Sequence, residues 1–289
     1  MRIGALIELC KDTDIDQSFL RLKSMGMESC QLVCWDRDIL NDEGAVGAVN
    51  EAVQKHGVQI SAFWCGWEGR KVWDFYEGQI TLGLVPAGYR AERVRMLLEG
   101  SDFAKRIHVT DFATHVGYMP ENPYDPKYQE VLSACKEVVE RCRANGQVFL
   151  FETGQETPVT LKRAIQDIER DLGEGCVGIN LDPANLIMYG KANPVDALDV
   201  FGEYVRGIHG KDGMYPTDGH ALGAEVPLGQ GKVNYPVFIE KLRSIGYEGD
   251  ITIEREISGE EQIRDIVTAK EILSRLILQS WYEDVQAGI

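Results

Sequence analysis

Val148-Phe-Leu-Phe-Glu152 is a run of four apolar residues that ends in a carboxylate, and Thr153 and Gly154 follow it directly. Continuous apolar runs of this length are typical of strands buried on both faces, as in a parallel sheet covered by helices. A charged side chain at the end of such a strand needs a partner, because burying an isolated charge is costly. The stretch therefore predicts a covered parallel sheet with a polar site at its edge.

The same pattern returns three times later in the chain, each time as a short apolar strand that delivers one potential metal ligand at its C-terminal end. The three stretches are Val177 to Asp182, Val205 to His209 and Asp250 to Glu254. We interpret the four side chains as one site, made of Glu152, Asp182, His209 and Glu254.

The order of the elements predicts the fold. Eight expected strands alternate with eight expected helices, and no Gly-x-Gly-x-x-Gly motif follows the first strand. This favours a (β/α)8 barrel over a doubly wound sheet, and we expect one domain spanning residues 1–289. The expected strands are 2–9, 27–35, 58–64, 108–115, 148–152, 176–182, 205–209 and 250–256. The expected helices are 16–25, with Leu20 and Leu22 facing inward, and 41–56, 89–107, 126–145, 158–172, 194–204, 235–245 and 260–278.

In such a barrel the C-terminal ends of all strands meet at one mouth, where active sites are built. The four candidate ligands all occupy this position. Two long irregular stretches, 65–88 and 210–232, follow the third and seventh strands, and we expect them to line the same mouth.

Composition restricts the possible partners. The chain has 30 Lys and Arg against 46 Asp and Glu, a formal net charge of -16, which disfavours nucleic acid and anionic membranes. Glu8 and Lys11 interrupt the first apolar run, and no later run is long enough to span a bilayer. Seven scattered Cys without Cys-x-x-Cys spacing fit reduced thiols in a core, so we expect a cytoplasmic protein.

The donor set indicates the metal. Three carboxylates and one imidazole form a hard site suited to Mn²⁺, our first choice, with Mg²⁺ or Co²⁺ as alternatives. Zn²⁺ is more typically coordinated by Cys and His. A six-coordinate ion held by four side chains keeps about two open positions, enough for a chelating hydroxyketone. Glu152 and Glu254, on the fifth and eighth strands, would then act as an acid-base pair on opposite sides of an enediolate.

The residues also resemble a known family, the sugar isomerases and epimerases with a xylose isomerase-like barrel, which includes the ketose 3-epimerases. The likeness covers nearly the whole chain. It rests on the order Glu152, Asp182, His209 and Glu254 and on two motifs, His209-Gly-Lys-Asp212 and Pro227-Leu-Gly-Gln-Gly231. The resemblance implies that the four residues hold a divalent ion and that the two Glu residues move the proton.

Alternatives to a ketose epimerase remain. The stretch Glu152-Thr-Gly-Gln-Glu156 differs from that of ketose 3-epimerases and resembles the broader sugar phosphate isomerase/epimerase group. Some of its relatives are C-glycoside deglycosidases, which cleave 3-oxo-glycosides and pair the barrel with a small β-rich subunit. A non-catalytic sugar-binding barrel is a third hypothesis. Endonuclease relatives are a fourth, but their multi-zinc sites need more His than the five present.

Substrate contacts are expected near the mouth from His115, Gln155, Lys211 and Trp67. Each also has a purely structural interpretation. His115 could be a hydrogen-bonded histidine at a strand end, and Gln155 and Lys211 could face solvent. Trp67 could pack in the core beside Trp35 and Trp64. Asp212 is expected to fix His209 or Lys211. The candidate phosphate-binding cations Arg70, Lys71 and Arg90 form no evident anion cradle, so we expect a neutral sugar as the substrate and a homo-oligomer as the assembly.

Overall fold

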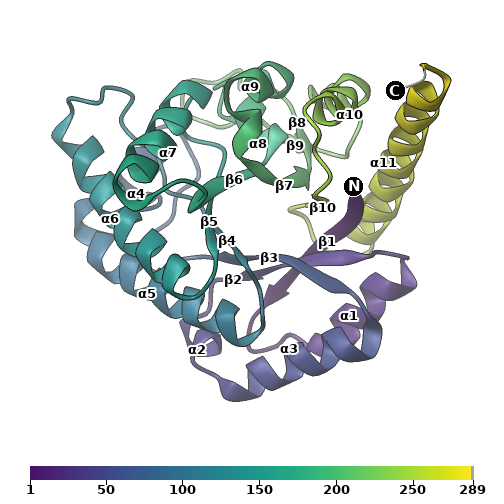
Figure 1. Ribbon diagram of the computed structural model, residues 1–289, viewed down its shortest axis with the longest axis horizontal. Helices are drawn as coiled ribbons and strands as arrows, with labels where there is room; N and C mark the ends of the chain where they lie inside the picture. The colour runs from purple at the N-terminus through teal and green to yellow at the C-terminus, as the bar shows by residue number, and fades with distance from the viewer. Residues whose placement is uncertain (288–289) are drawn as a thin grey trace.

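The computed structural model describes residues 1–287, with side chains as far as residue 279. In this part of the chain, eight parallel strands close into a barrel in the order β1-β10-β7-β6-β5-β4-β3-β2, which confirms the predicted (β/α)8 fold (Figure 1). The strands are β1 (Arg2–Leu9), β2 (Ser29–Cys34), β3 (Gln59–Cys65), β4 (Asp111–Thr114), β5 (Val148–Glu152), β6 (Val177–Leu181), β7 (Val205–Gly210) and β10 (Asp250–Ile253).

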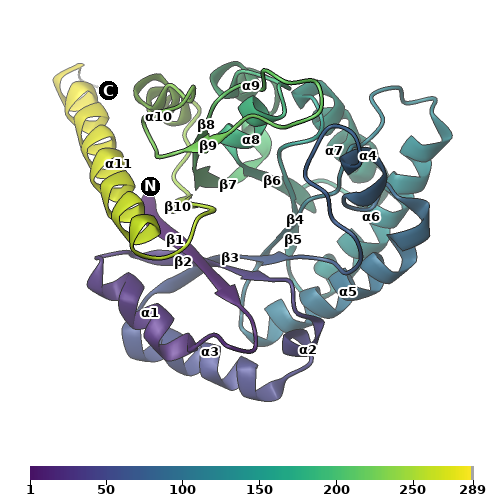
Figure 2. The ribbon, with the colours of Figure 1, turned by 180° about the vertical axis from the view of Figure 1, so that it is seen from behind.

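Helices surround the barrel and cover the outer faces of its strands (Figures 1 and 2). They are α1 (Ile15–Ser24), α2 (Arg37–Leu40), α3 (Glu43–His56), α4 (Gly78–Thr81), α5 (Ala87–Arg106), α6 (Pro126–Ala144), α7 (Pro158–Leu172), α8 (Pro183–Met188), α9 (Pro194–Phe201), α10 (Tyr235–Ser244) and α11 (Glu260–Ala287), with a 3-10 turn, η1, at Gly202–Tyr204. None of the described helices is long and apolar enough to cross a membrane.

Local sequence signals explain the best-predicted helix boundaries. Helix α7 begins at Pro158 because the Thr157 hydroxyl accepts a hydrogen bond from the backbone N–H of Thr160, and proline is favoured in the first turn. Helix α3 ends at His56, because the next residue, Gly57, has a φ of 66°, a left-handed conformation that glycine adopts easily. Such caps mark the helix ends in the sequence.

Several details differ from the sequence prediction. In α1 the inward-facing residues are Phe19 and Leu22, whereas Leu20 is 43% exposed. Strand β4 begins only at Asp111, because His108 has a φ of 60° that interrupts an extended strand. Helix α8 was not predicted, and α11 continues well beyond residue 278. The expected loop 210–232 also contains a two-stranded hairpin, β8 (Asp212–Gly213) with β9 (Glu225–Val226).

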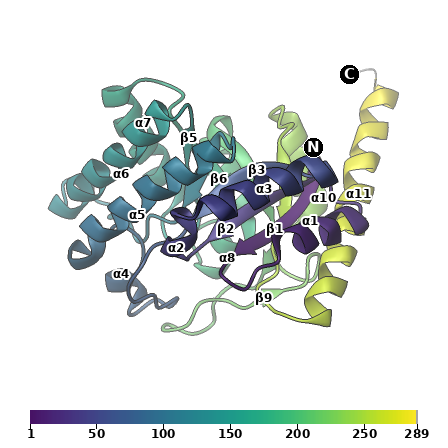
Figure 3. The same ribbon diagram turned by 90° about the horizontal axis from the view of Figure 1, so that it is seen from below.

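The two long loops meet at the mouth of the barrel. They lie at the same end of the molecule, which is seen from the side in Figure 3. The backbone N–H of Phe75 donates a 3.0 Å hydrogen bond to the carbonyl of His220. The rings of Tyr76 and His220 lie 5.2 Å apart. The loops after β3 and β7 thus form a bridge over the end of the barrel at which the candidate ligands lie.

Candidate metal centre

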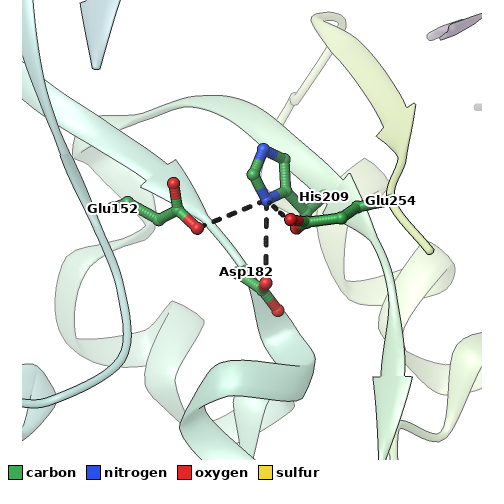
Figure 4. Close-up of side chains that lie close together, drawn as sticks. All are labelled: Glu152, Asp182, His209 and Glu254. Carbon is green, nitrogen blue, oxygen red and sulfur yellow. Dashed lines mark ion pairs between the residues drawn. The ribbon is translucent and has the colours of Figure 1, made fainter. Parts of the chain in front are cut away.

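Four strand ends bring the predicted ligands together. Glu152 ends β5, Asp182 follows β6, His209 lies in β7 and Glu254 follows β10. One potential ligand atom from each residue lies within 4.8 Å of the corresponding atoms of the other three. Figure 4 shows the imidazole of His209 in the middle of the three carboxylates. The convergence that the sequence pattern predicted is therefore present.

His209 Nδ1 is the central atom of the cluster. It lies 2.8 Å from Glu254 Oε2, 3.5 Å from Glu152 Oε1 and 3.6 Å from Asp182 Oδ2 (Figure 4). The side chains are strongly buried, with exposed fractions of 4% for Glu152, 0% for Asp182, 2% for His209 and 13% for Glu254. Few polar groups of a folded protein are packed this closely out of contact with water.

The hydrogen bonding of the cluster is incomplete. Among the described residues, Asp182 Oδ2, His209 Nδ1 and Glu254 Oε2 are buried and have no hydrogen-bond partner of good geometry. Asp182 uses its other oxygen, Oδ1, to accept the backbone N–H of Asn185 at 2.9 Å and so cap α8. Their charged neighbours are one another and Lys211, at ion-pair distances of 2.8 to 3.6 Å. A bound cation would give these buried atoms a further partner. Three oxygen donors and one nitrogen donor fit a hard divalent metal ion.

The surroundings shift the pKa values of the two glutamates in opposite directions. Burial raises the pKa of Glu152 to about 8, more than the nearby His209 lowers it. Burial also acts on Glu254, but Lys211 and His209 outweigh it and hold the pKa of this carboxyl well below its usual range. Without a metal ion, Glu152 favours the protonated form at neutral pH and Glu254 the ionised form.

Three side chains orient Glu152. The indole N–H of Trp64, in β3, donates a hydrogen bond to Oε2. His115 Nε2 lies 3.3 Å from Oε1, and the amide of Asn185 donates to the same oxygen at 3.4 Å. Burial lowers the pKa of His115 to about 4, so its imidazole is neutral at physiological pH. The structure thus places His115 against a proposed metal ligand, and its Nδ1 is buried without a partner.

Lys211 adds a positive charge at the edge of the cluster. Its ammonium group lies 2.8 Å from Glu256 Oε1, 3.4 Å from Glu254 Oε2 and 3.5 Å from Asp182 Oδ2, and only 2% of its side chain is exposed. Lys211 therefore does not face solvent, and its contact with a sugar oxygen stays a prediction. These neighbours outweigh burial and raise the pKa of Lys211 well above its usual value.

Asp212 has a different role from the expected support of His209 or Lys211. Its two carboxylate oxygens accept hydrogen bonds of 2.9 to 3.0 Å from the backbone N–H groups of Gly213, Gly229, Gly231 and Val233. A side chain at position 231 would collide with Asp212, since a Cβ there would lie 2.1 Å from its Oδ1. Asp212 therefore fixes the loop that carries the Pro227-Leu-Gly-Gln-Gly231 motif.

The other predicted contacts are placed around this cluster. Gln155 is 1% exposed, its Nε2 donates to the Tyr189 hydroxyl at 3.0 Å, and its Oε1 lacks a partner. Trp67 is fully buried, and its indole N–H donates a 3.2 Å hydrogen bond to the carbonyl of His115. The guanidinium of Arg93 lies 4.1 Å from the centre of its ring. The contact of Trp67 with substrate stays a prediction.

The sequence interpretation missed Trp73, because it lies in an irregular loop that has no hydrophobic periodicity. Trp73 is 39% exposed, and its ring lies 5.4 Å from that of His115. Asn185 was missed as well, although its position three residues after Asp182, with Pro183 between, is a recognisable helix-capping pattern.

Comparison with known proteins agrees with this architecture. The family model of the xylose isomerase-like TIM barrel matches residues 19–275. An uncharacterised protein of Methanocaldococcus jannaschii is 28% identical over 193 residues, which are 64% of this chain and 61% of that protein, so the match spans less than two thirds of the relative. The crystal structure of a xylose isomerase domain protein from Planctomyces limnophilus is 31% identical, with a TM-score of 0.87, and the match covers 95% of this chain and 96% of that chain.

Two more distant structures share the fold. An L-ribulose 3-epimerase is 14% identical with a TM-score of 0.74, and the match covers 100% of this chain and 98% of that chain. A xylose isomerase-like TIM barrel protein from Mycobacterium smegmatis, solved in complex with magnesium, is 17% identical with a TM-score of 0.71, and the match covers 96% and 97%.

Proposed function

The chain belongs to the xylose isomerase-like TIM barrel family, and from that membership and the geometry of its four-residue cluster we propose that it is a divalent-metal-dependent sugar isomerase or epimerase. One observation carries this proposal. Three carboxylates and an imidazole at four strand ends lie within 4.8 Å of one another, and three of their atoms are buried without a hydrogen-bond partner among the described residues. An L-ribulose 3-epimerase with the same fold supports it.

Glu152, Asp182, His209 and Glu254 would hold the ion. When bound there, a divalent ion would polarise the carbonyl of a hydroxyketone and acidify the neighbouring C–H. Mg²⁺ and Mn²⁺ both suit the donors, and the magnesium complex of the protein from Mycobacterium smegmatis supports an ion of this class.

The two glutamates would move the proton. Glu254, which Lys211 and His209 keep ionised, accepts a proton from the carbon next to the carbonyl and leaves an enediolate. Glu152 would carry the proton that is returned to this carbon from the other side. Strands β6 and β7 separate β5 from β10 in the barrel, so the two carboxyls reach the substrate from different directions. Return of the proton from the other side would invert the carbon.

An uncharged sugar is the proposed substrate class, because the cations near the mouth already have partners. The guanidinium of Arg70 pairs with Glu77, and that of Arg90 binds Glu130 and the carbonyls of Leu84 and Val85. Lys71 lies over the ring of Trp35, at 4.7 Å. A phosphate group would have to break one of these interactions to gain a cation.

The proposal is tested by incubating the protein with a panel of free ketoses, their phosphate esters and 3-oxo-glycosides, each with Mn²⁺, with Mg²⁺ and after chelation. We expect a new epimer or isomer in NMR spectra of a free ketose, dependent on added metal. Release of an aglycone from a 3-oxo-glycoside would instead favour the deglycosidase alternative and its partner subunit. Conversion that survives chelation would refute the metal-dependent mechanism.

A further inference from the structure

A buried glutamine on the far side of the barrel contacts the proposed ligand His209. Gln31 lies in β2 between Cys30 and Leu32, in a stretch that is otherwise apolar as far as Cys34. Its side chain is buried, with 1% of the residue exposed. Its Oε1 lies 2.6 Å from His209 Nε2. Strand β2 is not a neighbour of β7, because β1 and β10 lie between them in the ring. Gln31 therefore reaches across the inside of the barrel to the imidazole nitrogen that faces away from the carboxylates.

A second amide fixes the orientation of Gln31. Its Nε2 donates to Asn180 Oδ1 at 3.3 Å, which leaves Oε1 as the end that faces His209. Asn180 has room to lie there because the neighbouring residue on β7 is Gly207, where a Cβ would be 2.6 Å from Asn180 Oδ1. Gln31, Asn180 and His209 thus form a polar group below the proposed metal centre, built from three strands.

We propose that Gln31 is a positioning residue that keeps a proton on His209 Nε2 and thereby leaves the lone pair of Nδ1 for the metal ion. A carbonyl oxygen can only accept a hydrogen bond, so its 2.6 Å contact with Nε2 is favourable only when that nitrogen carries hydrogen. Nδ1 is the nitrogen that faces Glu152, Asp182 and Glu254, and its 2.8 Å contact with Glu254 Oε2 likewise calls for a hydrogen while no metal ion is bound. A bound ion would take the place of that hydrogen, and Gln31 would keep the one on Nε2.

A contact of Asn180 favours the opposite protonation state of the same atom, His209 Nε2. Its Nδ2 lies 2.9 Å from His209 Nε2, and a hydrogen bond from this amide would require a bare Nε2 and a proton on Nδ1. That tautomer would block the ligand atom. The Gln31 contact is shorter, and an oxygen facing a bare nitrogen at this distance would be repulsive, so Gln31 determines the tautomer.

The inference rests on the proposed function, because the lone pair matters only if the cluster binds a metal ion. Partners that orient a ligating histidine typically contribute 10-fold to 100-fold to metal affinity. We therefore expect Gln31→Met, which keeps the length of the side chain but removes the acceptor, to weaken Mn²⁺ binding by about 10-fold to 100-fold in calorimetric titration. Gln31→Glu, which keeps an acceptor oxygen, should restore affinity to within a few-fold of the wild-type value.

A matched control comes from the other end of the barrel. Gln147 is also a buried hydrogen-bonded glutamine, whose amide binds the Ser101 hydroxyl and the carbonyls of Ser101 and Val109. Gln147→Met should lower the melting temperature without changing Mn²⁺ affinity. Wild-type affinity in Gln31→Met, or equal losses in Gln31→Met and Gln31→Glu, would overturn the inference.

A direct readout separates this inference from the proposed function. Nitrogen-15 NMR of the histidine rings in the Mg²⁺-loaded protein should show His209 with its hydrogen on Nε2, assigned by comparison with His209→Asn. A hydrogen on Nδ1 would overturn the inference even if the metal binds. If the wild-type protein binds neither Mn²⁺ nor Mg²⁺, the proposed function fails. The metal-free spectrum then still tests the Gln31 contact, since a bare Nε2 would contradict it.

Discussion

The indole N–H of Trp64 donates a hydrogen bond to Oε2 of Glu152, across the intervening strand β4. This bond occupies one carboxylate oxygen and leaves Oε1 directed at His209 Nδ1, 3.5 Å away. The sequence analysis named Trp64 only as an aromatic neighbour of Trp67, whereas the structure gives it a hydrogen bond to a proposed acid-base group. Trp64 thus connects the rings of Trp35 and Trp67 to the candidate metal centre.

Replacing Trp64 by Phe should slow turnover while the fold is kept. The change removes the only hydrogen-bond donor of the side chain and leaves a buried carboxylate oxygen without that partner. Hydrogen bonds to charged groups contribute about 1.5–3 kcal/mol, so we expect kcat to fall by roughly 10-fold to 100-fold. A steady-state assay with the converted sugar measures this, and a kcat within twofold of the wild-type value would show that Trp64 does not position Glu152.

Glu152→Gln and Glu254→Gln should each reduce turnover by at least about 10²-fold, the lower end of what a general acid or base contributes. Both changes keep the size of the side chain but remove the exchangeable carboxyl. Asp250→Asn is a suitable control, because Asp250 begins the strand that Glu254 follows and lies at the other end of the barrel, in an ion pair with Arg2. Near-normal activity in either Gln variant would refute the two-glutamate mechanism.

Lys211→Met should tighten metal binding. The ammonium group lies within 3.5 Å of two proposed ligands, Asp182 and Glu254, where its charge competes with a divalent cation. Removing that charge should lower the dissociation constant of Mn²⁺ by at least several-fold, and calorimetric titration measures the change. Weaker binding in Lys211→Met would mean that the lysine supports the site rather than competing with the ion.

Glu156→Gln should stabilise the protein at alkaline pH. Burial raises the pKa of Glu156 to about 8, from an ordinary value of 4.5. Between these values the folded state binds one proton more than the unfolded state, so the free energy of unfolding falls as the pH rises. We expect the melting temperature of Glu156→Gln to exceed that of the wild type by several degrees at pH 8.5 and to match it at pH 4. An equal difference at both pH values would rule out this titration.

The sequence predicted those features that depend on strand periodicity. Val148–Glu152 and Pro158–Leu172 have the predicted boundaries, because an apolar run and a proline-containing cap mark them unambiguously. The four candidate ligands could be grouped because each ends a strand and parallel strands end at one mouth. Their roles as metal ligands and acid-base residues stay predictions.

Contacts between distant segments could not be predicted in this way. Nothing in the sequence indicates that Trp64 faces Glu152, or that Gln31 reaches His209 from a non-neighbouring strand. Asp212 stands beside Lys211 in the chain, yet it binds the backbone of residues 229–233, because the loop folds back onto it. Side-chain direction at a barrel mouth depends on loop conformation, which hydrophobic periodicity does not encode.

The central claim is that Glu254 and Glu152 exchange protons with the substrate from different sides, in a site that a divalent ion activates. Its most direct test is the isotopic composition of the product formed in D₂O at low conversion, measured by NMR and mass spectrometry with the metal-loaded protein. The account predicts one solvent deuteron at the inverted carbon of the product, and none in the unreacted sugar. A product that keeps its original hydrogen at that carbon would contradict the two-glutamate mechanism.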